Sequence, residues 1–236
     1  MQLLTVPLGF SDDRIDSIVG EALKRAESIG ALRQRGPQEC LHDLRHKLYA
    51  VRYHHQNYTR FETEQVEEFQ RDYGPPAGTS IQEQHPSVIY EVEAFLFQVR
   101  SSLDIVARFL AAAFGFSGET FGAHGDRVIS RLERNIPKEL AVPASAVATL
   151  IREAQASWID ETVRMRDEIA HRSALAGFSC FVQHPYEGGP EARIQYPTMP
   201  NGERVLDYVD RVYRELLAFC RQCLQYSLEA MARREQ

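Results

Sequence analysis

Residues 86–114, PSVIYEVEAFLFQVRSSLDIVARFLAAAF, decide the fold of this chain. Apolar side chains in this stretch fall on most sides of a helix rather than on a single stripe. A helix that is apolar on most sides has to be covered by other helices, so we expect it in the centre of a bundle. Five charges interrupt the stretch and argue against a membrane span, namely Glu91, Glu93, Arg100, Asp104 and Arg108.

Amphipathic helices are expected upstream of this central segment. After an extended arm over 1–10, Ser11-Asp12-Asp13 has the capping side chains that begin a helix, and Gly36-Pro37 is expected to end it. A second helix is expected over 38–72, because apolar residues recur there at helical spacing, followed by a break at 73–78. On one face of this expected helix lie Leu41, Leu44, Leu48 and Val51.

Downstream of the central segment, the pattern predicts helices and one small β element. A short helix is expected over 126–135, and a long one from Pro143 or Ser145 to about residue 173. Residues 178–199 alternate like a β-hairpin, and Asn201 is expected to cap a last helix to about residue 234. The predicted fold is therefore all-α, an up-and-down helical bundle with a small β-hairpin inserted before the last helix.

Two regions are expected within this fold, an N-terminal helical region over 1–75 that packs on the bundle and a helical domain over 86–236. The 236 residues are 44% hydrophobic, which is enough for a substantial core. The net charge of −6 argues against a protein that coats nucleic acid nonspecifically. The N-terminus lacks the pattern of a secretory signal, so we expect a cytoplasmic protein with free thiols.

One short segment near the end of the long helical pattern carries candidate chemistry: Arg166-Asp167-Glu168-Ile169-Ala170-His171. A guanidinium can hold a phosphate, and an imidazole can move a proton beside it. The spacing alone is weak, because roughly 2.4 pairs of Arg and His with four to six intervening residues arise by chance. Three are present, from Arg35 to His42, from Arg164 to His171 and from Arg166 to His171. Context must therefore decide.

Helical periodicity separates the two arginines that precede His171. Asp160, Arg164, Asp167 and His171 fall on one stripe, and Trp158, Thr162, Met165 and Ile169 form the adjoining stripe that is expected to face the core. Arg166 lies about 140° around the helix from His171, so Arg164 is the better aligned of the two. The alternative is a solvated charged face with no catalytic role.

The chain resembles the HEPN superfamily (higher-eukaryote and prokaryote nucleotide-binding domains) over roughly residues 86–234. The resemblance rests on Arg166-Asp167-x3-His171, on the helix over 91–104, and on the hairpin and last helix that follow. It implies a helical homodimer that brings two such motifs into one cleft. It further implies either a metal-independent endoribonuclease, as in a toxin or a phage-defence effector, or a catalytically inactive module for dimerisation, protein interaction or nucleotide binding.

For a ribonuclease of this kind, the expected catalytic residues are Arg166, His171 and Asp167. His171 would act as acid or base, Arg166 would clamp the phosphate, and Asp167 would orient the imidazole. Arg164 and Arg172 would bind substrate. We expect no metal or other cofactor, RNA or a nucleotide as ligand, no DNA and no membrane. Glu93, Arg100 and Asp104 would support the site from the central helix, or Arg100 and Asp104 would form a pair that fixes packing.

Three further groups favour structural interpretations. His42 and His46, with Cys40 nearby, have the spacing of a metal pair, but no third ligand from another element is evident. Cys220 and Cys223 are expected to be buried thiols. The basic and aromatic run from Arg45 to Tyr58 suits either single-stranded RNA or a helix surface with long cationic side chains.

Overall fold

The computed structural model describes residues 12–33, 35–72, 80–83, 86–117, 120–122, 125–134, 136–172, 178–183 and 191–234. The expected N-terminal arm and the expected break at 73–78 lie outside these residues. The described α-helices are α1 (Asp13–Ser28), α2 (Arg35–Asp72), α3 (Pro86–Phe114), α4 (Asp126–Glu133), α5 (Ala141–Ala154), α6 (Asp160–Arg172) and α7 (Val205–Arg234).

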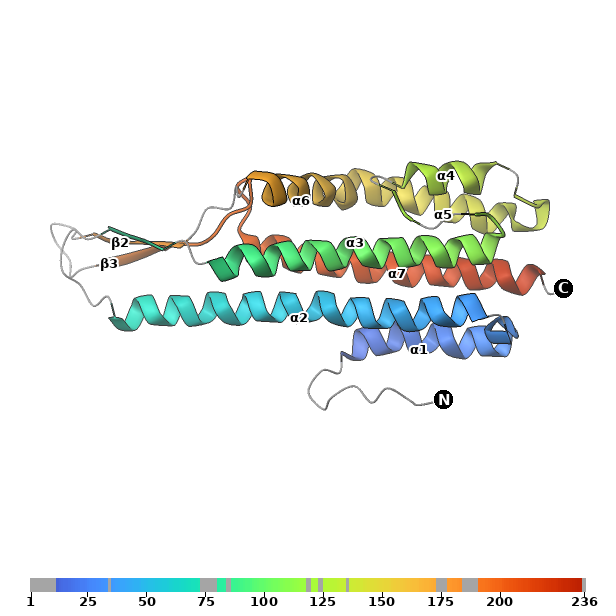
Figure 1. Ribbon diagram of the computed structural model, residues 1–236, viewed down its shortest axis with the longest axis horizontal. Helices are drawn as coiled ribbons and strands as arrows, with labels where there is room; N and C mark the ends of the chain where they lie inside the picture. Colours follow the sequence, from blue (N-terminus) through green and yellow to red (C-terminus); the bar gives the residue numbers. More distant parts are fainter. Residues whose placement is uncertain are drawn as a thin grey trace.

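The helices lie side by side in an elongated bundle, which confirms the predicted all-α fold (Figure 1). The apolar helix α3 packs against α2, α7 and α6, so it is covered on several sides as its sequence requires. Helix α1 lies against α2 and α7, while α4 and α5 continue the layer of α6. None of the described helices combines the length and the apolar character needed to cross a membrane.

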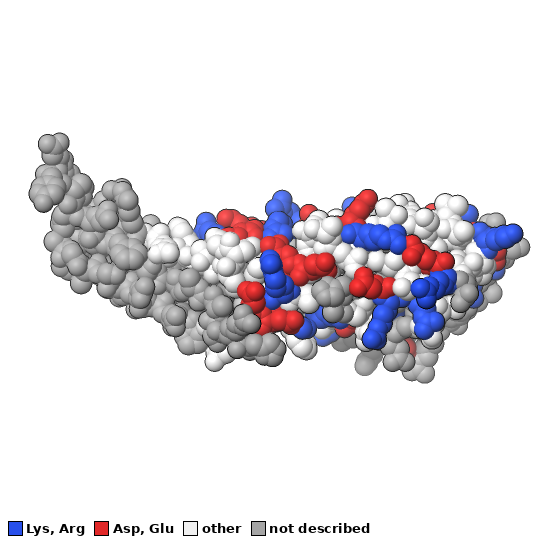
Figure 2. Space-filling view, turned by 90° about the horizontal axis from the view of Figure 1, so that it is seen from above, with Lys and Arg blue, Asp and Glu red and all other residues white. Residues whose placement is uncertain are grey.

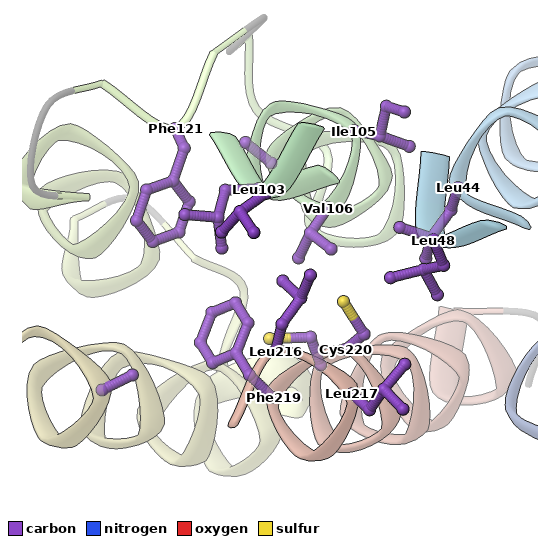
Figure 3. Close-up of a cluster of buried hydrophobic side chains, with 14 of the residues drawn as sticks. Leu44, Leu48, Leu103, Ile105, Val106, Phe121, Leu216, Leu217, Phe219 and Cys220 are labelled. Carbon is purple, nitrogen blue, oxygen red and sulfur yellow. The ribbon is translucent and has the colours of Figure 1, made fainter. Parts of the chain in front are cut away.

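The core is formed where α2, α3 and α7 meet (Figure 3). Leu44 and Leu48 from α2 approach Val106 of α3 and Leu216 of α7, all of them almost fully buried. The Phe219 ring of α7 packs edge-on against the rings of Phe121 and Trp158, with centroids 6.0 Å and 6.1 Å apart. The apolar residues that share one predicted face of α2 are all buried, namely Leu41, Leu44, Leu48 and Val51.

A three-stranded antiparallel sheet projects from one end of the bundle (Figure 1). The predicted hairpin is formed by β2 (Phe178–Gln183) and β3 (Glu191–Gln195). A strand that was not predicted, β1 (Ser80–Glu83), comes from the connection between α2 and α3 and pairs with β2. Its sequence, SIQE, has a single apolar residue, so its pairing with a distant hairpin has no local signal.

Gly36-Pro37 was expected to end the first helix, and this prediction is wrong. Helix α1 ends at Ser28, where Gly30 adopts a φ of 73° that suits glycine. Gly36 and Pro37 instead lie in the first turn of α2. A proline fits there because the first amides of a helix have no partner within the helix.

The prediction that Asn201 caps the last helix is also wrong. Helix α7 begins at Val205, four residues later. The Asn201 side chain accepts a hydrogen bond from the Glu203 amide at 3.0 Å and donates to Glu161 of α6 at 2.9 Å. Asn201 therefore shapes the turn before α7 and attaches it to α6.

Two carboxylates, Asp12 at the N-cap of α1 and Asp16 within it, attach this helix to the bundle. Asp12 caps α1 by accepting from the Arg14 amide at 2.9 Å, and it also accepts from the Tyr213 hydroxyl of α7 at 2.8 Å. Arg52 of α2 pairs with Asp12 at 3.3 Å. One turn later, Asp16 accepts from Arg45 at 2.6 Å and from the Tyr49 hydroxyl at 2.8 Å. We call these six side chains the α1 latch: Asp12, Asp16, Arg45, Tyr49, Arg52 and Tyr213.

The pKa of Asp12 is lower than its usual 3.8. Burial alone would raise this pKa, but the hydrogen bonds from Tyr213 and Arg14 outweigh it by favouring the charged carboxylate. The stabilisation from the ionised carboxylate is therefore complete above the unfolded pKa near 3.8. It is lost as the pH falls through the lower folded pKa.

We predict that Asp12→Asn, which keeps a capping side chain but removes the charge, lowers the free energy of unfolding at pH 7 by about 1–2 kcal/mol. The gap to the unmodified protein should narrow below pH 3.8, as both proteins then carry an uncharged group at this position. Urea unfolding at pH 7 and across the acid range measures both effects. The exposed control Glu27→Gln on the same helix should change stability by less than about 0.5 kcal/mol. A gap that is independent of pH would contradict the role of the Asp12 charge.

Candidate functional site

The candidate motif lies at the end of a long helical rod. A π-helical turn at Gln155–Ile159 joins α5 to α6, so the chain stays helical from Ala141 to Arg172. A π turn adds a residue to one turn of the helix and shifts the faces that follow. Trp158 and Ile159 of this turn are buried, which fixes the rotation with which α6 enters the motif.

The faces of α6 agree with the predicted stripes for the side chains that are described. Trp158, Thr162, Met165 and Ile169 are buried. On the adjoining stripe Asp160, Arg164 and Asp167 are exposed. His171 and Arg172 belong to the last turn of α6, but their side chains lie outside the described part of the structure.

Arg166 lies on a different face of α6 from Arg164, as periodicity predicts. Its side chain is 37% exposed, and it borders one small cavity together with Val99 and Leu103 of α3. The space enclosed there is about 10 Å³, which is at the lower limit for one water molecule. This contact is therefore packing, and any ligand of Arg166 would have to approach from the solvent side.

Asp167 engages the Arg166 guanidinium directly. The Asp167 Oδ1 atom accepts from Nε at 3.0 Å and from Nη2 at 2.5 Å. The pair offsets the charge of Arg166, but it leaves the Nη1 donors of the fork outside the contact. The predicted contact of Asp167 with His171 falls on a side chain that is not described.

Arg164 is exposed and makes no hydrogen bond or ion pair with another side chain in the described part of the structure. It lies about 20° from the direction of His171, because seven residues nearly complete two helical turns. Arg164 is thus the more accessible of the two arginines, whereas Arg166 is the better anchored.

The residues expected to support the site from α3 separate into two roles. Glu93 is exposed to solvent. Arg100 and Asp104 form a half-buried ion pair at 3.7 Å, and Asp104 also accepts from the Phe121 amide at 2.8 Å. Asp104 thereby attaches the connector after α3 to the helix, which favours the packing interpretation. Arg100 adjoins Arg166 at the contact between α3 and α6.

A polar cluster that was not predicted attaches α6 to the start of α7. Arg211 contacts Glu161 of α6 at 2.8 Å and Glu203 at 2.8 Å. The Glu203 carboxylate raises the pKa of Arg211, Glu161 adds to this effect, and burial opposes it. Tyr208 donates to Thr162 at 3.3 Å beside them. These contacts position α6 relative to α7, but they use residues distant in sequence.

A second cluster joins α2 to the start of α7. Glu62 is almost fully buried, accepts from the Tyr58 hydroxyl at 2.9 Å and forms an ion pair with Arg204. The Arg204 guanidinium stacks over the Tyr196 ring at 3.9 Å. A buried carboxylate needs such a cation, since removing one partner leaves an uncompensated charge.

The basic run on α2 is occupied by contacts within the molecule. Arg45 and Arg52 belong to the α1 latch, and Lys47 donates to Gln98 of α3 at 3.1 Å. His54 contacts Glu91 at 2.8 Å, and His55 contacts Asp210. These pairs favour the packing interpretation over an RNA surface.

The histidine and cysteine candidates also favour structural interpretations over a metal site. His42 and His46 are exposed, whereas Cys40 is buried. Within the described residues, no three His, Cys, Asp or Glu side chains gather as metal ligands would. Cys220 and Cys223 are free and fully buried, which confirms their prediction, and burial raises the pKa of the Cys220 thiol to about 12.

Charges of both signs alternate over the face that carries α4 and α6, which is seen from above in Figure 2. No broad positive field marks the described part of this face. Comparison with known proteins adds no assignment, because no family model, curated protein or solved structure matches the chain.

We predict that Arg204→Ala lowers the free energy of unfolding by about 3 kcal/mol, because it leaves Glu62 buried without its cation. Breaking the exposed pair of Arg152 and Glu133 with Arg152→Ala should cost less than about 1 kcal/mol. Urea unfolding measures both losses. Adding Glu62→Gln to Arg204→Ala should recover part of the loss. Equal losses in the two single variants would show that the burial of Glu62 is unimportant.

Proposed function

We propose that this chain is a HEPN-like, metal-independent endoribonuclease that acts as a homodimer. The observation that carries the proposal is that Arg164, Arg166, Asp167 and His171 belong to one unbroken helix. Asp167 holds the Arg166 guanidinium by hydrogen bonds, while Arg164 stays exposed. A rigid helix is a precise support for such groups.

In the proposed reaction the RNA 2′-hydroxyl attacks the adjacent phosphorus. The bond from phosphorus to the 5′-oxygen breaks, leaving a 2′,3′-cyclic phosphate and a 5′-hydroxyl end. His171 takes the 2′-hydroxyl proton, and the imidazole of a second copy of the motif gives a proton to the leaving oxygen. Guanidinium groups stabilise the charge that builds on the non-bridging oxygens.

The pairing of Arg166 with Asp167 adds a condition to this mechanism. A phosphate can use only the donors that Asp167 leaves, so the carboxylate orients the guanidinium while lowering its net attraction for anions. Arg164, together with Arg172, would then provide the additional positive charge that brings the phosphate to the helix.

A second candidate is a catalytically inactive HEPN-like module for dimerisation, protein interaction or nucleotide binding. The neutralised Arg166 and the alternating charges of the face in Figure 2 favour it. Such a module would retain the helix and its pairs, but it would not cleave RNA.

We predict that the purified protein cleaves single-stranded RNA in the presence of EDTA and leaves 2′,3′-cyclic phosphate ends. Arg166→Ala and His171→Ala should each lower the rate at least about 100-fold, as is typical for a lost acid–base or charge-stabilising group. Arg164→Ala should weaken substrate binding more than turnover. Gel analysis of labelled RNA measures the rates, and analytical ultracentrifugation checks that the variants keep the oligomeric state.

The matched control is Arg131→Ala on α4, an exposed arginine distant from the motif in sequence, which should leave the rate unchanged. Cleavage retained in both Arg166→Ala and His171→Ala would refute the mechanism. No cleavage by a folded dimer would favour the inactive module. A rise in melting temperature with a nucleoside phosphate would then identify a nucleotide-binding form.

A further inference from the structure

A groove of about 410 Å³ runs between α1 and α7, away from the α6 motif. Helix α1 contributes Arg14 and Ile18 to it. The remaining lining residues belong to α7, namely Arg214, Leu217, Ala218, Arg221 and Gln222. The groove therefore combines aliphatic and cationic side chains from two helices that the α1 latch holds together.

The aliphatic residues form its floor and the arginines its rim. Ile18 and Leu217 are 4% and 6% exposed, so they present only a small apolar surface at the bottom. None of the described residues that line the groove is acidic. Three guanidinium groups thus gather at one place on a chain whose net charge is −6.

The guanidinium groups keep donors for a ligand. Arg14 pairs with Asp12, yet its side chain remains 59% exposed. Among the described residues, Arg214 donates only through its Nε, to the Asp210 carbonyl at 3.3 Å. Arg221 is exposed and contacts no hydrogen-bonding partner in the described part of the structure. A carboxylate of a ligand at this rim would meet the charges of Arg214 and Arg221, which no described carboxylate offsets, whereas Asp12 already offsets the charge of Arg14.

The aliphatic floor of the groove distinguishes between two anionic ligands, single-stranded nucleic acid and an acidic helix. Single-stranded nucleic acid binds where bases can stack on aromatic rings, and none of the described lining residues is aromatic. An aliphatic floor with an arginine rim instead matches the way in which an amphipathic helix lies in a groove. We propose that this groove binds an acidic amphipathic helix of a partner protein.

The spacing of the two α7 arginines specifies which pattern of residues a partner helix in the groove would need. Arg214 and Arg221 are seven residues apart, which is about 10.5 Å along the helix axis. A partner helix lying beside α7 would present carboxylates at positions i and i+7, with leucine-like side chains at i+3 and i+4 over Ile18 and Leu217. Because a single partner helix would bury little surface and rely on exposed charges, we expect its binding to be weak and sensitive to salt. This interface does not depend on the proposed ribonuclease activity, because none of its residues lies in α6.

The test uses a fluorescent peptide of about four helical turns with Glu at i and i+7 and Leu at i+3 and i+4. A second peptide has the same composition in an order that abolishes the stripe. Anisotropy titrations are made with the full chain, with Arg214→Glu/Arg221→Glu, and with Arg127→Glu/Arg131→Glu. The last variant is the matched control, because it reverses two exposed charges on α4.

We expect micromolar binding of the striped peptide, weakened at least about tenfold by the α7 reversal and less than about twofold by the α4 reversal. The shuffled peptide should bind about tenfold more weakly, since affinity requires the apolar stripe as well as charge. RNA cleavage by the α7 variant should equal that of the unmodified protein, so this test and the test of the proposed function fail separately.

Three outcomes would overturn the proposal. They are no binding of the striped peptide, equal binding of the two peptides, and equal weakening by the two charge reversals. Displacement of the peptide by a short single-stranded RNA, with the same dependence on Arg214 and Arg221, would assign the groove to nucleic acid instead.

Discussion

The bundle is organised by the need to remove α3 from water. Residues apolar on most sides of one helix cannot be covered by a single partner, so α2, α6 and α7 all pack on it. The polar groups that α3 carries are satisfied by its neighbours: Glu91 meets His54, Gln98 meets Lys47, and Arg108 meets Asp43. All three partners belong to α2, so these contacts set the position of α2 along α3.

Ion pairs and hydrogen bonds then fix the positions of the outer helices α1 and α6 in the bundle. The α1 latch holds α1 to both α2 and α7, and Arg211 holds α6 to the turn before α7. This use of arginine has a functional consequence. Arg45 and Arg52 look available for RNA when read along α2 alone, yet their charges are matched by Asp16 and Asp12. Arg214 and Arg221 at the rim of the groove between α1 and α7 keep more of their donors, and so does Arg164.

The motif on α6 and the groove on α7 place two kinds of chemistry on different parts of one bundle. On α6, Asp167 pairs with Arg166, and the same helix also carries His171. At the groove, aliphatic side chains lie beneath several arginines and no described acid lines the site. The first arrangement suits proton transfer next to a phosphate, whereas the second suits recognition of an acidic helix. The two proposals are physically independent for this reason.

The sequence by itself determined the helices, their buried faces and the hairpin, because each depends on the spacing of apolar residues within a short segment. It also determined that Arg164 and Arg166 lie on different faces of α6, which follows from helical period alone. Only the tertiary structure decided that Gly36-Pro37 begins a helix, that β1 joins the hairpin, and that Asp167 pairs with Arg166. The same holds for the groove between α1 and α7, whose two sides are about 200 residues apart in the chain. Such features depend on contacts between segments distant in sequence and on which of several possible partners a side chain contacts. The local spacing of residues predicts neither.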